Sequence, residues 1–379
     1  MNASVANDPE ALLRLILAGG PLPPRQRLLD AHGQAEQALR AGPAAWRAAG
    51  CSPEQCASLA RPEPAALRRG LDWLARPGQH LLASTDADYP ALLQSLDPAP
   101  LGLFVQGDPG LLWHPAVAVV GSRTPSPSGA ELAADFAAAF ARRGLSVVSG
   151  LAAGIDGCAH RAALDTPGGL TVAVVATGLD LTYPPRHAGL QARIAARGAL
   201  VSEYPPGTAP RPGQFPARNR IVAGLGLGTV VIEAALRSGA LITARLAAEA
   251  GREVFALPGS VRNPRAQGCH RLIRDGALLV EQPEEVVAGL AGVAQVLGQA
   301  LRTRLGAPTE QARAAPGRAP PSSDPDYQCL WQALDDNPTG MDSLIQRSGL
   351  TTARLSAMLL VMELDGKVVA AHGRYCRKP

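Results

Sequence analysis

Lysine is almost absent from this chain. Only Lys367 and Lys378 are lysines among the 36 basic residues, and the formal net charge is +4. The protein is therefore not a basic coat, and a site for polyanions would have to gather its arginines on one face. Arginine in place of lysine, together with abundant Ala, Gly and Pro, is typical of a GC-rich genome, so the bias alone says little about function.

Metal-site and membrane signals are also missing. The six cysteines include no C-x-x-C pair, and no second Cys/His pair at zinc-ligand spacing accompanies Cys51 and Cys56. The apolar stretch Met358–Met362 is far short of the ~20 residues needed to cross a bilayer. Residues 1–10 carry acidic side chains and no basic segment, unlike a signal peptide. We expect a cytoplasmic protein with reduced thiols, no metal, no cofactor and no membrane contact.

Sequence signatures of catalysis are absent too. No glycine-lysine-Ser/Thr occurs, which excludes ATP hydrolysis by a P-loop. The run from Gly224 to Gly228 precedes a predicted strand and lacks the G-x-x-G ending of a dinucleotide fingerprint. His160, His187 and His270 form no Ser-His-Asp or Cys-His pattern by spacing, so no catalytic residue is predicted.

The hydrophobic pattern divides the chain into four segments. Residues 1–75 contain short helices broken by Gly and Pro, as in a SAM-like or helix-hairpin-helix domain. Residues 76–290 alternate short β-branched runs with helical stretches, which predicts an α/β fold with a doubly wound, mainly parallel sheet. Residues 291–324 are rich in Ala, Pro, Gly and Ser and predict a flexible linker. Residues 325–379 show helix, turn, helix and hairpin, a winged-helix-like order compatible with binding either DNA or protein.

Small and basic residues recur where the central strands end. Ligands of open parallel sheets bind beyond these carboxyl ends, so we expect one shared ligand surface there. The residues concerned are Gly121, Ser122 and Arg123 after the first central strand, Gly150 and Gly154 after the second, and Ser238 and Gly239 after the fifth. The segment from Gly150 to Gly154 can present backbone N–H groups to phosphate at a helix N-terminus. Alternatively, or in addition, Asp156 caps that helix through His160.

A second group of candidates surrounds an aromatic residue. They are Arg211, Phe215, Arg218, Asn219 and Arg220. An aromatic ring near several guanidinium groups suits single-stranded nucleic acid, whose phosphates pair with arginine and whose bases stack on the ring. The alternative is that Phe215 belongs to the core and that one arginine forms a structural ion pair with Glu203 or Asp180.

Taken together, these motifs resemble the DNA-processing protein A family (DprA, also called Smf). The matching segments are Gly121–Arg123, Ser149–Asp156, Ser202–Pro205, Phe215–Ile221 and Ser238–Ala244. The resemblance implies an extended Rossmann-like domain that binds single-stranded DNA and forms a homodimer. It also implies a cytoplasmic protein that protects DNA taken up during natural transformation and loads the RecA recombinase onto it.

The resemblance also implies roles for individual residues. Arg123 and Arg211 would bind phosphate, and the pocket would be shaped by Gly121, Ser122, Gly150, Gly154, Phe215, Arg218, Asn219 and Arg220. His270 stands where the family usually has asparagine, and the lysines frequent around the family's DNA groove are missing here. Arginine can replace their charge but not their geometry.

Two other functions compete with DNA binding. Lysine-decarboxylase-like phosphoribohydrolases carry a Pro-Gly-Gly-x-Gly-Thr-x-x-Glu loop. The segment from Gly226 to Glu233 lacks the proline, and its glutamate comes one residue late, which takes a general acid out of reach. The other alternative, a scaffold for recombination proteins, leaves Arg123 and Arg220 unexplained. The sequence therefore favours a DNA-binding mediator that is not an enzyme.

Overall fold

The N-terminal part of the chain is a cluster of short helices. The computed structural model describes residues 7–290, 294, 298, 325–335, 338–365, 367–371 and 374–377. The N-terminal helices are α1 (Pro9–Leu17), α2 (Leu22–His32), α3 (Ala35–Arg40), α4 (Gly42–Ala48), α5 (Pro53–Ala60) and α6 (Pro64–Leu74). Ser52 and Gln55 form a capping box at the start of α5, which fixes where that helix begins. The sequence pattern missed α6.

A buried guanidinium holds the first helices together. Arg25 of α2 is 8% exposed and donates to the carbonyl oxygens of Leu15, Ile16 and Gly20. Leu15 and Ile16 belong to the last turn of α1, where carbonyl oxygens lack a full set of helical partners, and Gly20 lies in the loop that follows. This arginine therefore serves folding and is not available to a ligand.

The central unit is built on a nine-stranded sheet in the order β1-β2-β6-β5-β4-β3-β7-β8-β9. Strands β3 to β9 run parallel, and the β1–β2 hairpin is added antiparallel to β6. The strands are β1 (Gln79–Ala83), β2 (Gly102–Gly107), β3 (Ala116–Val120), β4 (Ser146–Ser149), β5 (Thr171–Val174), β6 (Ala199–Ser202), β7 (Gly228–Val231), β8 (Glu253–Ala256) and β9 (Leu278–Leu279). The predicted α/β class with a mainly parallel sheet is confirmed, although β1 was not foreseen.

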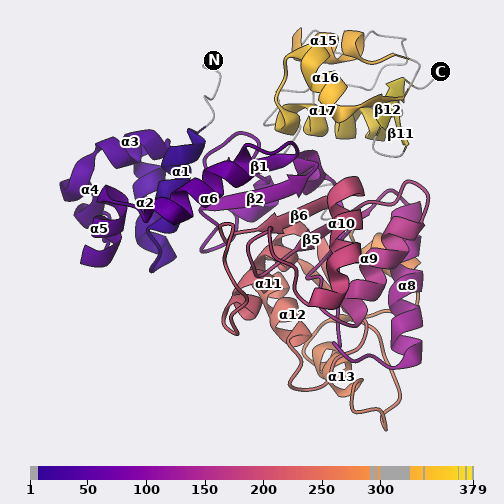
Figure 1. The fold of residues 1–379 in the computed structure, drawn as a ribbon. Coiled ribbons are helices and arrows are strands. Elements are labelled where there is room, and N and C mark those ends of the chain that lie inside the picture. Colours follow the sequence, from indigo (N-terminus) through magenta and orange to yellow (C-terminus); the bar gives the residue numbers. More distant parts are fainter. Residues whose placement is uncertain are drawn as a thin grey trace.

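Helices cover both faces of this sheet (Figure 1). On one face lie α8 (Pro127–Arg142), α9 (Ile155–Asp165) and α10 (Ala188–Arg197), and on the other α11 (Gln214–Leu225), α12 (Ala240–Glu249) and α13 (Gln267–Arg274). Alternate residues of a strand point to opposite faces, so Val117 and Val119 pack under α8 while Ala118 and Val120 pack under α11. Shorter elements complete the unit, namely α7 (Ala91–Gln94), η1 (Pro109–Trp113) and η2 (Pro185–His187).

The strand order reverses at β3. From β3 the chain proceeds outward through β4, β5 and β6, then returns to place β7, β8 and β9 on the other side of β3. The crossovers leaving β3 and β7 consequently turn to opposite faces of the sheet. Such a reversal opens a crevice at the carboxyl ends of the two strands, which is where open α/β sheets bind ligands.

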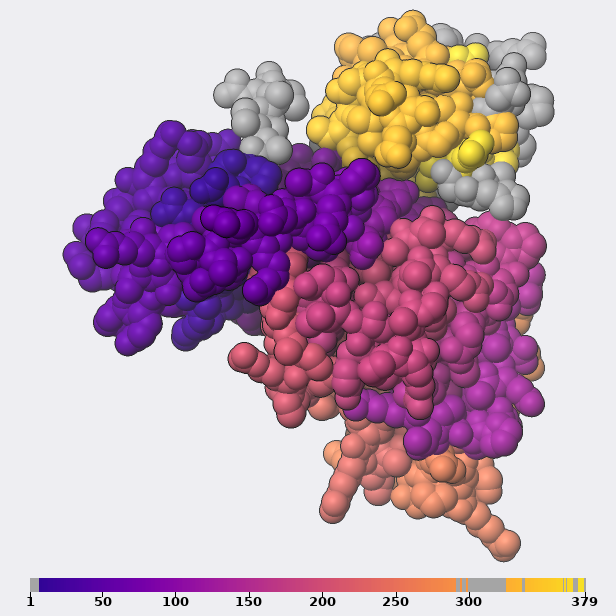
Figure 2. Space-filling model, viewed as in Figure 1, coloured from indigo at the N-terminus to yellow at the C-terminus, as the bar shows by residue number. Residues whose placement is uncertain are grey.

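The C-terminal unit is a winged helix, as predicted. It contains α15 (Pro325–Ala333), β10 (Thr339–Gly340), α16 (Met341–Ser348), α17 (Thr352–Leu364), β11 (Val368–Ala371) and β12 (Arg374–Arg377). Gly349, with φ of 67°, ends α16, and the Thr351 side chain caps α17. The space-filling view shows this unit resting against the region of the β1–β2 hairpin (Figure 2). The expected linker at 291–324 lies outside the described residues, apart from 294 and 298.

Candidate functional site

A cavity of about 490 Å³ lies at the point where the strand order reverses. Loops after β3, β4 and β7 form its rim, and α11 forms one wall. From the candidates named above it brings together Gly121, Ser122, Arg123, Gly150, Arg218, Asn219, Ser238 and Gly239. The shared surface that we expected from the strand ends is therefore present as a continuous hollow.

A smaller hollow of about 110 Å³ adjoins the first and shares Arg123, Gly150 and Arg218 with it. Phe215 lines this second hollow together with Tyr183, which is 43% exposed. The two ring centroids lie 5.2 Å apart, and the guanidinium carbon of Arg123 lies 5.5 Å from the centroid of Phe215. An exposed cation and two accessible rings thus stand side by side, as needed to hold a phosphate and a base together.

Arg218 forms part of the wall between the two hollows. It is 4% exposed and donates through Nη1 to the carbonyl oxygens of Gly150, at 2.6 Å, and Val174. Burial lowers its pKa to about 10, against the opposing effect of Asp156, so it remains charged at neutral pH. Its Nη2 makes no hydrogen bond to another residue that the structure describes. We conclude that Arg218 contributes positive charge from a fixed position in the wall.

Some backbone N–H groups of the loop from Gly150 to Gly154, which we expected to face phosphate, are already hydrogen-bonded within the protein. Asp156 accepts hydrogen bonds from the backbone N–H groups of Gly150, at 3.1 Å, and Ala152, at 3.2 Å. Burial raises the pKa of Asp156, while Arg218 and these hydrogen bonds act in the opposite direction. The alternative capping through His160 is not observed either, because His160 Nδ1 lies 2.7 Å from Thr171 Oγ1. The loop is thus organised by its own carboxylate.

Gly154 supports the cavity from behind and does not line it. Its φ is 83°, and a Cβ at this position would lie 2.2 Å from the carbonyl oxygen of Ser122. Only glycine permits this close approach between the loops after β3 and β4. Its expected place in the pocket is therefore corrected to a packing role.

Arg220 does not reach either hollow. It forms an ion pair with Glu203, with Nη2 to Oε2 at 2.7 Å, and both side chains are 14% exposed. It also donates to the carbonyl oxygen of Pro98. The structure therefore contains the ion pair with Glu203 that we gave as the alternative. Arg220 does not line the pocket that it was expected to shape.

Arg211 lies outside both linings, on the exposed loop before α11. Its backbone N–H donates to Gln214 Oε1 at 2.6 Å, and its side chain forms no ion pair within the described ranges. A phosphate contact at Arg211 therefore stays a prediction.

Sequence reasoning missed two residues of the site. Arg237 lines the larger cavity, is exposed and forms no ion pair with any residue that the structure describes. Its position directly before Ser238 and Gly239 was a signal that could have identified it. Tyr183 had no such signal, because it is far from Phe215 in sequence and only the fold brings the two rings together.

The carboxylate of the enzymatic alternative is engaged elsewhere. Glu233 is 5% exposed, accepts from the backbone N–H of Ser126 at 2.9 Å and from Asn263 Nδ2 at 3.2 Å, and lines neither hollow. Within the described residues no cluster of His, Cys, Asp or Glu could hold a metal ion. No helix in that same part of the chain is both long and apolar enough to cross a membrane.

Comparison with known proteins agrees with this geometry. The family model for DNA recombination-mediator protein A matches residues 80–291, and the model for the DprA winged helix domain matches residues 314–374. The chain belongs to the DNA recombination-mediator protein A family.

Two members of this family illustrate the extent of the likeness. Protein Smf of Escherichia coli K12 is 40% identical over 312 residues, which cover 82% of this chain and 80% of the relative. DNA processing protein DprA of Streptococcus pneumoniae R6 is 48% identical over 203 residues, which cover 54% of this chain and 71% of the relative. The likeness to the first extends well beyond the matched central unit.

Two solved structures of family members are similar to this one. The X-ray structure of DprA from Streptococcus pneumoniae superimposes with a TM-score of 0.67 at 36% identity, covering 75% of this chain and 98% of that one. A structure of DprA from Helicobacter pylori, whose subject is the single-stranded DNA binding mode of that protein, gives a TM-score of 0.50 at 31% identity. The match covers 53% of this chain and 92% of that one. The DprA fold of the central unit is thereby confirmed.

Proposed function

We propose that this chain binds single-stranded DNA across the two adjoining hollows. The observation that carries the proposal is the exposed guanidinium of Arg123 over the ring of Phe215, at the carboxyl edge of the sheet. A base stacked on the aromatic pair would leave its phosphate near Arg123, and the strand would continue past Arg237 in the larger hollow. The reported single-strand binding of the Helicobacter pylori relative supports the same ligand class.

Sequence-independent binding follows from this chemistry. Guanidinium groups recognise phosphates, which are the same at every nucleotide, and aromatic faces accept any base. Tyr183 and Phe215 contact each other and leave ring faces open to an unpaired base, whereas a base within a duplex is already stacked on its neighbours. We therefore propose a preference for single strands over duplexes at this site.

Binding without catalysis is the proposed activity. Glu233 is committed to Ser126 and Asn263, and Asp156 is committed to two backbone N–H groups. A general acid or base needs hydrogen-bond reach to the reacting atom. Neither carboxylate is free to supply it without dismantling the loops that it organises.

Fluorescence anisotropy with a labelled oligothymidine tests the proposal. Arg123→Ala combined with Arg237→Ala should weaken binding and make it less dependent on salt, because both remove phosphate contacts. Arg40→Ala is the matched control, since Arg40 is exposed on α3 and pairs with Glu36. The proposed site is wrong if the double variant binds the oligonucleotide with wild-type affinity and wild-type salt dependence.

We propose further that the bound strand is passed to the RecA recombinase during natural transformation. Family membership supports this role, and a strand held through its phosphates leaves most base edges open for a second protein. The assay is RecA ATPase activity on single strands coated with single-strand binding protein. Wild-type protein should shorten the lag, and the double arginine variant should not. Equal lags with and without the wild-type protein would refute loading.

A homodimer through the edge of the sheet is the proposed assembly. Strand β9 ends the sheet, and its Leu278 and Leu279 are 46% and 51% exposed. An exposed apolar edge strand is a template for pairing with another chain, and a second copy offers the identical edge. Leu279→Lys should produce a monomer in light scattering, whereas Val369→Lys on the winged helix should not. Monomeric wild-type protein at micromolar concentration would contradict the assembly.

A further inference from the structure

Helix α17 is buried on two faces. One face packs in the core of the winged-helix unit through Leu355, Met358, Leu359 and Met362. The other carries Ala353, Ala357 and Val361, which lie four residues apart and outside that core, yet are only 6%, 3% and 5% exposed. Residues spaced by four share one side of a helix. Something other than the winged helix's own core therefore covers this second side.

Element η1 of the central unit contacts the N-terminal half of α17. A Cβ built on Gly110 would lie 3.2 Å from Thr352 Cγ2 and 3.5 Å from Ser356 Oγ, so helix and η1 are in close contact. Asp88 Oδ1 accepts a hydrogen bond from the backbone N–H of Ala353 at 2.6 Å. Asp88 is itself fixed, because Trp113 Nε1 donates to its carbonyl oxygen at 2.8 Å. In addition to the Thr351 cap, the N-terminus of α17 thus has a backbone N–H bound by a side chain of another structural unit.

This contact occupies the part of the motif that usually meets DNA. Helices α16 and α17 form a helix-turn-helix, whose second helix enters the major groove with its N-terminal residues against the bases. Here Thr352, Ala353 and Ser356 face the central unit of the same chain. We propose that the winged helix is held in a closed position in which α17 is masked by η1 and Asp88, so that the intact protein does not bind duplex DNA through this helix.

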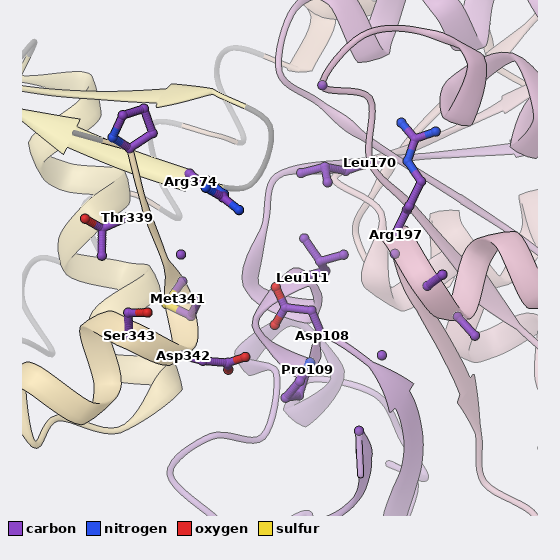
Figure 3. Close-up of a pocket in the computed structure, with 18 of the residues that line it drawn as sticks. Asp108, Pro109, Leu111, Leu170, Arg197, Thr339, Met341, Asp342, Ser343 and Arg374 are labelled. Carbon is purple, nitrogen blue, oxygen red and sulfur yellow. The ribbon is translucent and has the colours of Figure 1, made fainter.

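The closed position has a weak point beside the contact. A cavity of about 930 Å³ separates the two units there and is lined by residues of both. Asp108 of the central unit and Asp342 of α16 face each other across it (Figure 3). Burial raises the pKa of Asp108, and the neighbouring charge of Asp342 raises it further. The Asp108–Asp342 pair by itself opposes docking, although Arg197 and Arg374 line the same cavity and offset part of that repulsion.

Hydrogen exchange on the full chain tests the closed position. Asp88→Ala removes the acceptor for the Ala353 N–H and should speed its exchange about fivefold, the value expected for losing a helix cap of ~1 kcal/mol. Asp88→Asn retains an acceptor oxygen and is the matched control. Ser356→Arg inserts a long side chain against Gly110, outside the winged-helix core, and should speed exchange at Ala353, Ala357 and Val361 together.

A second measurement follows the position of the whole unit. Small-angle scattering should give a larger radius of gyration for Ser356→Arg than for wild type, and a radius no larger than wild type for Asp342→Asn. If exchange in α17 and the radius of gyration are the same in Ser356→Arg as in wild type, the closed position is refuted.

Duplex DNA supplies the third measurement. Added to wild-type protein, it should leave exchange at the N-terminus of α17 unchanged, and protection of those amides by the duplex would overturn the proposal. None of these measurements uses single-stranded DNA, so they remain decisive even if the central site is wrongly assigned.

Discussion

Replacing Arg123 by alanine should weaken single-strand binding mainly through its salt dependence. Arg123 is exposed and has no ion pair with any described residue, so its charge is available to one phosphate. Each phosphate contact with a single strand contributes about 0.7 to the magnitude of the slope of log affinity against log salt. Over a tenfold change in salt, down to ~0.1 M, that slope corresponds to about fivefold in affinity. We therefore expect Arg123→Ala to reduce the slope by about 0.7 and the affinity by about fivefold.

Replacing Phe215 should produce a different signature. Stacking of one base on an aromatic side chain is worth about 1–3 kcal/mol, and it releases no counterions. Phe215→Ala should therefore reduce affinity by about tenfold while leaving the slope nearly unchanged. Because Arg123 lies 5.5 Å from the ring centroid, loss of the ring also frees this side chain, and the double variant should lose less than the sum of the two.

Anisotropy titrations at five salt concentrations separate the two effects. Arg123→Lys keeps the charge and should keep the slope, although it loses the planar contact with Phe215. Arg40→Ala should match wild type in both slope and affinity. An unchanged slope in Arg123→Ala, or an equal loss of slope in Phe215→Ala, would refute the division of labour between cation and ring.

Three further predictions concern the surroundings of the site. Arg220→Met should lower the free energy of urea unfolding by about 3 kcal/mol, because Glu203 is left unpaired. Adding Glu203→Leu should restore most of that stability and leave DNA affinity intact. Loss of affinity in the double variant would show that Arg220 contacts DNA. Gly154→Ala should lower the free energy of unfolding by about 2–3 kcal/mol and weaken DNA binding, since its Cβ would meet the Ser122 carbonyl oxygen. An unfolding free energy equal to that of the wild type would contradict this. Burial lowers the pKa of His160 to about 3, so the folded state favours the neutral ring and loses stability as the pH falls below about 6.5, by up to ~1.4 kcal/mol per unit. His160→Gln should remove that slope in unfolding measured from pH 7 to 4, and an unchanged slope would assign it to another group.

The fold could be predicted because burial leaves a strong trace in sequence. Strands buried on both faces must be apolar throughout, so runs such as Val117–Val120 and Thr171–Val175 matched β3 and β5 closely. Strand β1 was missed because its residues are only partly buried and mix polar with apolar side chains. Helix α6 was missed for a similar reason, since Arg68, Arg69 and Asp72 expose much of its length.

The location of the cavity could also be predicted from the sequence, but the contacts of each residue in it could not. Parallel strands bring their carboxyl ends to one edge whatever the loops contain, so the pattern of strands and loops was enough to place Gly121, Gly150 and Ser238 together. The Asp156 hydrogen bonds depend on loop conformation, which no periodicity records. Tyr183 reaches Phe215 through the fold alone, and spacing in sequence carries no information about such a pair.

The segment Arg218-Asn219-Arg220 shows why a basic motif should not be treated as one surface. Successive residues of a helix point about 100° apart, so three neighbours on α11 cannot face one ligand. Arg218 turns toward the sheet and Asn219 toward the cavity, while Arg220 meets Glu203. Buried guanidinium groups stay charged where a buried lysine would lose its proton, which lets this lysine-poor chain use arginine in its walls as well as on its surface. Exposure therefore separates the arginines that can contact DNA from those that build the site, and it does so where residue type and spacing cannot.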